Sequence, residues 1–270
     1  MSGLPWLDPY DDDQAFPDPE RALREPDGLL AVGGNLAPRR VLRAYRLGIF
    51  PWYSPEQPIL WWSPDPRTVL FPDKIKVSRS LGKTLKRATF QVTLDRAFER
   101  VIRCCGEPRN GEPGTWITPE IIKAYSQLHR LGFAHSVESW HEGQLVGGLY
   151  GVAIGQVFYG ESMFSRRSDA SKAALVVLCR QLQRWGFAVI DCQMHTQHLI
   201  SLGAEDIPRR RFIALLERYC PRPGRPGPWA LDEAISEAAP PGDASPPGPT
   251  DGNVNQRSGC HDEPARKQWA

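Results

Sequence analysis

One stretch, from Gly143 to Gln193, constrains the fold more than any other part of this 270-residue chain. It begins with two extended segments, QLVGGLYGVA and QVFYGESMFS, whose tight Ile154-Gly155 corner predicts a β-hairpin. The helical segment ASKAALVVLCRQLQRW follows, with Asp169 as its expected N-cap and Gly186 at its end. The apolar run FAVIDCQM then predicts a buried strand. We expect the hairpin and this strand to share one sheet.

Three polar side chains are out of place in these apolar segments. Asp191 and Gln193 are two residues apart and share one face of a regular strand, roughly 6.6 Å apart. Glu161 lies near the end of the hairpin. A buried carboxylate costs several kcal/mol unless it is paired or hydrogen-bonded. The three therefore predict a site, with the acidic and amide groups facing a cleft. Alternatively, each carboxylate pairs with an arginine of the SRRSD loop and only holds that loop.

Composition excludes several classes of protein. The formal net charge is +2, so any basic surface must be local. The N-terminus MSGLPWLDPYDDD lacks the basic start and apolar run of a signal peptide, and no window is long and apolar enough to span a membrane. The six cysteines are scattered apart from one adjacent pair, which favours reduced thiols in the cytoplasm over a disulfide framework.

The last fifty residues differ in kind from the rest. Residues 221–270 contain ten of the chain's 26 prolines, and Trp229 and Trp269 are their only aromatic residues. So little apolar surface cannot offset the entropy of ordering a chain. We therefore expect a disordered tail.

The region from Phe16 to Trp62 is dense in Pro, Gly and Trp, and one helix is expected there, from Pro38 to Leu47. Trp52 lies between prolines in FPWYSP, where it is either a ligand contact or core. For Trp61 and Trp62 the core interpretation is better. Trp116 is a second loop-borne tryptophan, just ahead of a helix that Thr118 can cap.

Residues 74–87 carry six basic side chains and no acidic one. Ser78 can cap a short helix there, which is either an ordinary solvated face or a phosphate-binding surface. The basic side chains at helical spacing are Arg79, Lys83, Lys86 and Arg87.

Further elements follow from capping residues and periodicity. We expect a helix from Asp95 to Cys104, a half-exposed strand over AHSVESW, and an amphipathic helix from Arg209 to Tyr219. The three arginines that begin the last helix oppose its dipole, so a ligand or an acidic neighbour is expected beside them.

Several motifs carry little weight. Cys192, His195 and His198 have no fourth ligand at a sensible spacing, so no metal is expected. Cys192 lies inside the apolar run, which disfavours it as a nucleophile. Neither GxxxxGK[ST] nor GxGxxG occurs, and FSRRSDASK replaces the glycine-rich loop that an acetyl-CoA enzyme needs. We expect no cofactor.

Ten blocks in order closely resemble leucyl/phenylalanyl-tRNA–protein transferases. They are GLLAVGGNL, GIFPW, ILWWSPDPR, GTWIT, HSVESW, LVGGLYGV, GESMFS, ASK, IDCQ and LGAEDIPRR, within about residues 16–218. The resemblance implies an α+β fold, with a small N-terminal α/β domain followed by an acetyltransferase-like (GNAT) domain. The expected boundaries are a flexible N-terminus (1–15), an N-terminal domain (16–88), a catalytic domain (89–220) and the tail (221–270).

The resemblance also implies an activity: transfer of leucine or phenylalanine, less readily methionine, from charged tRNA to proteins beginning with Arg or Lys, which marks them for degradation. The expected partners are aminoacyl-tRNA and these acceptor proteins, with no membrane and a monomeric enzyme. Two rivals remain. An acyl-CoA N-acyltransferase would bind acetyl-CoA, and a tRNA-binding module without catalysis would leave the three buried polar groups unexplained.

Residue by residue, the resemblance assigns Asp191 and Gln193 to catalysis, with Glu161 beside the reacting centre. It places Trp52 and Trp116 against the 3′-terminal adenosine, and the basic helix on the tRNA surface. The residues matching the pocket for the aminoacyl side chain are Leu149, Phe158, Met163, Ser165, Leu175 and Leu178. Leu149 and Thr196 depart from the commoner pattern, in which some members have Met and Asn.

Overall fold

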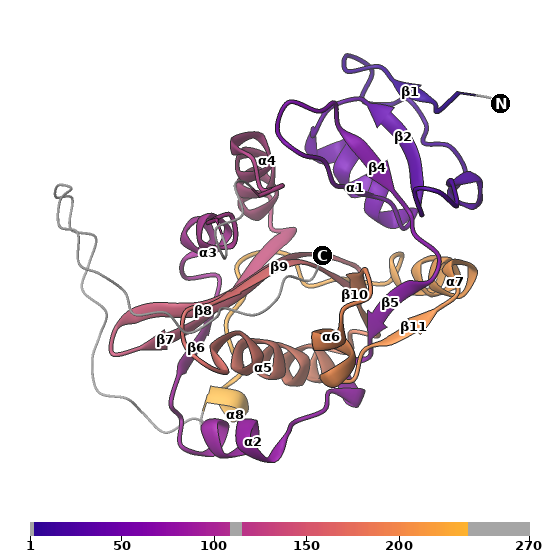
Figure 1. Cartoon of the computed structure of the whole chain (residues 1–270). Helices are drawn as coiled ribbons and strands as arrows, with labels where there is room; N and C mark the ends of the chain where they lie inside the picture. The colour runs from indigo at the N-terminus through magenta and orange to yellow at the C-terminus, as the bar shows by residue number, and fades with distance from the viewer. Residues whose placement is uncertain (1–2, 109–114, 237–270) are drawn as a thin grey trace, which may run out of the picture.

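The structure is a computed structural model, which describes residues 3–108 and 115–236. It is a mixed α/β protein with two sheets, one of four strands and one of seven (Figure 1). The smaller sheet has the order β1-β2-β4-β3. Its strands are β1 (Trp6–Leu7), β2 (Leu29–Gly33), β3 (Phe50–Pro51) and β4 (Leu60–Trp62).

Helix α1 (Pro38–Arg46) lies beside the smaller sheet, and its C-terminal end leads directly to β3. Proline occupies its first turn, Ala37 makes no side-chain cap, and Gly48 has φ of 75° just past its end. The predicted helix is thereby confirmed. The fully buried Trp61 confirms the core interpretation for that residue, whereas Trp62 is half-buried.

The larger sheet has the order β11-β5-β10-β9-β8-β7-β6. Strand β10 pairs parallel to β9 and antiparallel to β5. The predicted hairpin is confirmed as β8 and β9, and the predicted buried strand as β10. The strands are β5 (Arg67–Leu70), β6 (Gln91–Leu94), β7 (Ala134–His141), β8 (Gln144–Ile154), β9 (Val157–Ser165), β10 (Val189–Gln193) and β11 (Glu205–Ile207).

Helices cover the larger sheet, with α5 below it in Figure 1 and α3 and α4 above it. Ser78 and Thr118 cap α2 and α4 with their side-chain oxygens, as predicted. The helices are α2 (Arg79–Lys86), α3 (Phe98–Cys105), α4 (Pro119–Arg130), α5 (Ala170–Arg184), α6 (Gln197–Ser201), α7 (Arg209–Tyr219) and α8 (Glu233–Ser236), with 3-10 turns at Pro19–Arg21 and Pro72–Lys74.

Three local predictions were wrong because other contacts involve the residues concerned. Asp169 has φ of 67° and does not cap α5, since its carboxylate binds Lys172 at 2.9 Å. Helix α3 begins at Phe98, since Asp95 instead accepts hydrogen bonds from His135 and Ser136.

Strand β7 was the third of these errors. Its first six residues are buried rather than half-exposed, because helices α3 and α5 both contact it.

Residues 3–15 and 221–236 make more contacts with the rest of the chain than predicted. In the segment expected to be flexible, β1 pairs with β2, and the carbonyl of Asp8 accepts a hydrogen bond from Arg40 at 2.8 Å. In the expected tail, Trp229 is only 3% exposed and stacks on His135 at 3.7 Å. The prediction of disorder was therefore wrong for residues 221–236, whereas residues 237–270 lie outside the described residues.

Strand β5 lies before the domain boundary expected at residue 88, yet it pairs with β10 and β11. The chain therefore passes from the smaller sheet to the larger one between Trp62 and Arg67. This passage places β5 directly beside β10, the strand that carries Asp191.

Candidate active site

Two register shifts interrupt the strands at the predicted site. In the β8–β9 pair, Tyr150 faces Ser162 and Gly151 faces Gly160, so Glu161 is an extra residue. In the β10–β5 pair, Cys192 is the extra residue between Asp191 and Gln193. Such bulges re-aim side chains and increase the local twist. The regular alternation assumed for Asp191 and Gln193 is therefore broken between them, and Gln193 has φ of 63°.

The Glu161 carboxylate is the centre of a buried hydrogen-bond network. Its Oε1 atom accepts hydrogen bonds from the Tyr45 hydroxyl at 2.7 Å and from the Gln193 amide Nε2 at 2.9 Å. Its Oε2 atom accepts one from the Tyr125 hydroxyl at 3.0 Å, and the two tyrosine hydroxyls also contact each other. Four segments that are distant in the sequence thus meet at one carboxylate.

The pKa of Glu161 is raised to about 7. Burial is the main cause, because it disfavours the charged form, and the Asp191 charge adds to it. The hydrogen bonds from Tyr45 and Tyr125 act in the opposite direction. A carboxylate with a pKa near neutrality can exchange a proton under physiological conditions.

Asp191 is held differently, in a buried ion pair with Arg67. The Arg67 Nε and Nη2 atoms donate to Asp191 Oδ1 and Oδ2 at 2.7 and 2.6 Å. Arg67 Nη1 also donates to the Gly48 carbonyl at 3.1 Å. The guanidinium lies 4.8 Å from the ring centroid of Phe50 and 4.7 Å from that of Phe212.

Asp191 Oδ1 also accepts the backbone N–H of Gln193 at 2.9 Å. Hydrogen bonds therefore form a continuous chain from Arg67 through Asp191 and Gln193 to Glu161. The structure brings the three predicted polar residues together in one network, but it fully buries Asp191. The expectation that the Asp191 carboxylate faces a cleft was wrong, because a bidentate arginine occupies both of its oxygens.

The alternative, in which each carboxylate pairs with an arginine of the SRRSD loop, was also wrong. Neither carboxylate pairs with an arginine of the SRRSD loop, and Arg166 instead pairs with Glu107. Sequence reasoning missed Arg67, although an arginine that opens the apolar run RTVLF is as anomalous as Asp191. Tyr45 and Tyr125 were missed as well, since apolar helix faces give no signal for a hydroxyl at the tip of a buried ring.

Five residues assigned to an apolar pocket belong to one buried cluster. Leu149 and Met163 face each other across β8 and β9, and Ile190 of β10 belongs to the same cluster. Ser165 lies apart at the end of β9, where its hydroxyl donates to the Arg167 carbonyl at 2.7 Å. The five cluster members are Leu149, Phe158, Met163, Leu175 and Leu178, all with no exposed surface.

The two loop tryptophans have different surroundings. Trp52 is half-buried, and its ring lies edge-on to that of Trp62, with centroids 5.6 Å apart. Trp116 is 8% exposed, and its indole N–H has no hydrogen-bond partner among the residues that the structure describes. Trp116 belongs to the hydrophobic cluster that contains Tyr45 and Tyr125, and Trp52 packs against this cluster.

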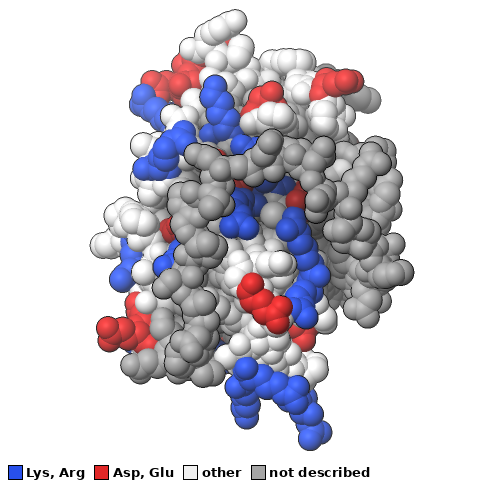
Figure 2. All heavy atoms as spheres, turned by 90° about the vertical axis from the view of Figure 1, so that its left-hand side faces the viewer, with Lys and Arg blue, Asp and Glu red and all other residues white. Residues whose placement is uncertain are grey.

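The basic helix α2 is exposed along the predicted side. Lys and Arg side chains gather at the lowest part of the molecule in Figure 2, at the height of α2 in Figure 1. The exposed residues are Arg79, Lys83, Lys86 and Arg87. In the arginine-rich start of α7, Arg209 is buried, donating to the Ser63 carbonyl and lying 3.8 Å from Glu20.

Within residues 3–108 and 115–236, no group of three His, Cys, Asp or Glu side chains is arranged to hold a metal ion. Burial raises the pKa of the Cys192 thiol well above its usual range, so a thiolate nucleophile is disfavoured there. No helix in these same ranges is long and apolar enough to cross a membrane.

Comparison with known proteins assigns a family to this geometry. The model of the leucyl/phenylalanyl-tRNA protein transferase matches residues 69–217, and that of its N-terminal domain matches residues 34–65. The chain belongs to this family. It is accordingly an aminoacyltransferase.

Proteins named leucyl/phenylalanyl-tRNA–protein transferase are similar over most of this transferase. That of Aromatoleum aromaticum is 59% identical over 231 residues, which are 86% of this chain and 96% of the other. That of Thiobacillus denitrificans is 57% identical over 225 residues, 83% and 99% of the two chains. Among solved structures, L-PGS from Bacillus licheniformis matches at a TM-score of 0.33 and 12% identity, over 56% of this chain and 48% of that one, too weak a likeness to carry an argument.

Proposed function

We propose that this transferase moves leucine or phenylalanine, and methionine less readily, from charged tRNA to the N-terminal amine of proteins that begin with Arg or Lys. Such a transfer would mark these proteins for degradation in the cytoplasm, with the enzyme acting as a monomer on an acetyltransferase-like (GNAT) catalytic domain. The observation that carries the proposal is the buried network of Glu161, Gln193, Tyr45 and Tyr125.

The chemistry needs no cofactor to activate the donor. An aminoacyl ester is already activated, and an N-terminal amine has a pKa of about 7.7–8.0, so roughly a tenth to a fifth of it is neutral at pH 7. The amine nitrogen forms a bond to the ester carbonyl carbon, the bond from that carbon to the ribose oxygen breaks, and the amine loses one proton. A protein group that accepts this proton and returns one to the leaving oxygen balances the reaction.

Glu161 is the group best suited to that proton transfer. Its pKa of about 7 lies near the operating pH, and Gln193 donates to the same oxygen that Tyr45 does. Gln193 contacts the attacking amine in this proposal. Asp191 has both oxygens engaged by Arg67, so its contribution is to fix the backbone of Gln193 rather than to take the proton.

The remaining assignments rest on the type and placement of the side chains. Trp52 and Trp116 stack on the 3′-terminal adenosine, and the exposed basic residues of α2 bind tRNA phosphates. The aminoacyl side chain enters the cluster around Leu149 and Met163, which is apolar as Leu and Phe require. Ser165, at the edge of this region, lines its entrance.

The decisive experiment is incubation of charged Phe-tRNA with a peptide that begins with Arg. We expect the peptide to gain one phenylalanine, detected by mass spectrometry, without ATP, metal or coenzyme. E161Q should slow single-turnover transfer about a hundredfold, whereas E138Q should not, since Glu138 is a buried carboxylate outside the network. Absence of transfer by the unmodified enzyme would exclude the proposed function.

A further inference from the structure

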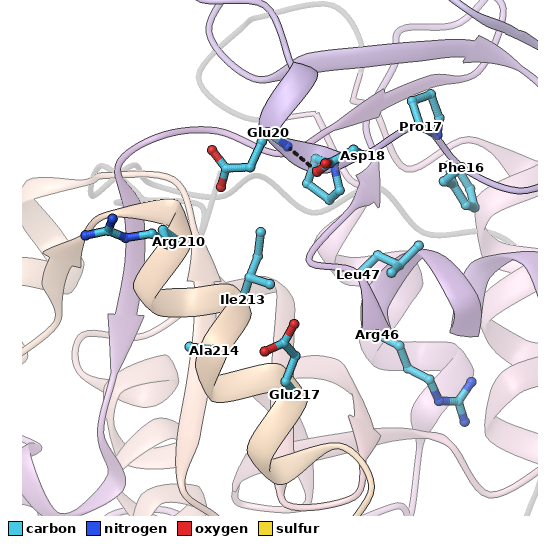
Figure 3. A pocket seen from close by; sticks show the side chains of 11 residues that line it. Phe16, Pro17, Asp18, Glu20, Arg46, Leu47, Arg210, Ile213, Ala214 and Glu217 are labelled. Carbon is cyan, nitrogen blue, oxygen red and sulfur yellow. Dashed lines mark hydrogen bonds between the residues drawn. The ribbon is translucent and has the colours of Figure 1, made fainter.

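A pocket of about 510 Å³ lies between residues 16–20 and helix α7 (Figure 3). Its apolar lining includes Phe16, Leu47 and Ile213. The carboxylate of Glu217 points into it, and Asp18 and Glu20 lie on the opposite wall. None of these residues takes part in the network around Glu161.

Glu217 is the acidic side chain that an occupant of the pocket would meet, since the Asp18 carboxylate accepts the Glu20 backbone N–H at 2.9 Å and the Glu20 carboxylate lies 3.8 Å from Arg209. The guanidinium groups of Arg46 and Arg210 point away from it in Figure 3, and that of Arg46 donates to the Leu42 carbonyl at 3.4 Å. Glu217 is exposed, and among the described residues its carboxylate has no hydrogen-bond or ion-pair partner. A ligand with an apolar stem and a positive end, such as a Lys or Arg side chain, is complementary to these walls.

Two residues that line the pocket, one on each side, come directly after active-site residues in the sequence. Arg46 follows Tyr45, which donates to Glu161, and Ile213 follows Phe212, which packs on Arg67. An occupant of the pocket therefore contacts the same two helices that position the reacting groups.

The peptide chain and one hydrogen bond set an upper limit to the distance between Arg46, which lines the pocket, and the Glu161 carboxylate. Neighbouring Cα atoms are about 3.8 Å apart and a tyrosine side chain spans about 6.5 Å. With the hydrogen bond of 2.7 Å from Tyr45 to Glu161, the carboxylate of Glu161 lies within about 13 Å of the Arg46 Cα atom. An extended peptide covers this distance in about four residues, since each adds about 3.3–3.6 Å.

We propose that this pocket binds a basic side chain of the acceptor polypeptide, about three to six residues after the amine that is acylated. The inference rests on the proposed function, and it adds a second point of acceptor recognition to the reacting amine. Glu217 pairs with the cation, while Leu47 and Ile213 contact the aliphatic stem.

The test uses peptides that begin with Arg and carry a single Lys, or uncharged norleucine, at each of positions 2 to 7. With the full-length enzyme we expect Lys to lower the KM about threefold relative to norleucine at one or two positions between 3 and 6. E217Q should abolish this difference, and E217K should reverse it. E142Q, which alters a glutamate with an 85% exposed side chain in the β7–β8 turn, is the matched control and should retain it.

Two results would overturn the inference: a Lys effect that does not depend on its position, or one that persists in E217Q. Failure of the proposed function is recognised separately, because the norleucine peptides would then receive no amino acid from the unmodified enzyme either. Circular dichroism melting of E217Q should match that of E142Q, which excludes misfolding as the cause of a lost Lys effect.

Discussion

Arg67 and Asp191 form a bidentate ion pair between neighbouring strands, with donor–acceptor distances of 2.7 and 2.6 Å. Arg67 opens the strand that follows the smaller sheet, and it also donates to the Gly48 carbonyl at the end of α1. The pair thereby ties the N-terminal part of the chain to the strand that bears Gln193. Asp191, which accepts the Gln193 backbone N–H, is thus held by an arginine 124 positions earlier in the sequence.

Disruption of this pair should destabilise the protein. In R67M, Asp191 would remain as an unpaired buried carboxylate, which costs about 3–5 kcal/mol. R67K keeps the charge but cannot make the fork of two hydrogen bonds, so an intermediate loss is expected. Urea unfolding followed by circular dichroism measures both. R39A, which removes an exposed arginine, is the control and should change stability by less than about 0.5 kcal/mol.

The pKa of Glu161 makes stability depend on pH. Because its pKa is about 7 in the folded state against 4.5 for the free group, the folded state holds a proton that the unfolded chain has released between these values. Stability is therefore expected to fall as pH rises through that window, by roughly 3 kcal/mol in total.

Comparison with E161Q isolates this effect, since the substitution removes the titrating group. The pKa of His135 is lowered by burial, so His135 contributes in the opposite direction: stability rises as pH rises towards 6.5. The quantity to measure is the difference between the two proteins in unfolding free energy at several pH values. A difference that stays constant from pH 4.5 to 7 would contradict the raised pKa.

The transfer rate should have its own pH dependence. If deprotonated Glu161 accepts the proton, single-turnover transfer has a midpoint near pH 7 from Glu161, and it rises further until the acceptor amine, with a pKa of about 7.7–8.0, is neutral. D191N should lower the rate without moving the midpoint near pH 7, because Asp191 positions Gln193 and does not take the proton. A midpoint that disappears in D191N and persists in E161Q would reverse the two assignments.

Replacement of either loop tryptophan should weaken binding of tRNA. Stacking on one base contributes roughly 1–3 kcal/mol, so W52A or W116A should raise the Kd for charged tRNA about ten- to a hundredfold. W6A, which removes a tryptophan that is 68% exposed in β1, is the control. Filter binding with full-length tRNA and with tRNA lacking its terminal adenosine separates stacking from general loss of affinity: the truncated tRNA should bind W52A and the unmodified enzyme equally.

Replacing lysines of α2 with alanine should weaken the dependence of tRNA binding on salt concentration. K83A/K86A should reduce the slope of log K against log salt concentration by about two, since each phosphate contact releases one condensed cation. W52A should leave that slope unchanged. Equal slopes in K83A/K86A and the unmodified enzyme would remove α2 from the tRNA surface.

The order and type of the central elements could be predicted from the sequence. Two extended segments joined by a tight corner at Ile154-Gly155 gave the hairpin, and capping residues gave α2 and α4, since these signals are local. The three polar residues in apolar strands were also correctly grouped, because the cost of burying a polar group applies wherever the strand packs. Strand β5 was missed, since its pairing partners come more than a hundred residues later.

The sequence by itself determined the hairpin, the long helix and the buried strand, because hydrophobic periodicity and capping act between neighbours along the chain. Only the tertiary structure decided the roles of the polar groups. The bulges at Glu161 and Cys192 re-aim the side chains, Arg67 encloses Asp191, and two tyrosines converge on Glu161. A carboxylate's pKa and partners depend on which distant groups surround it, and this information arises only when the segments pack together.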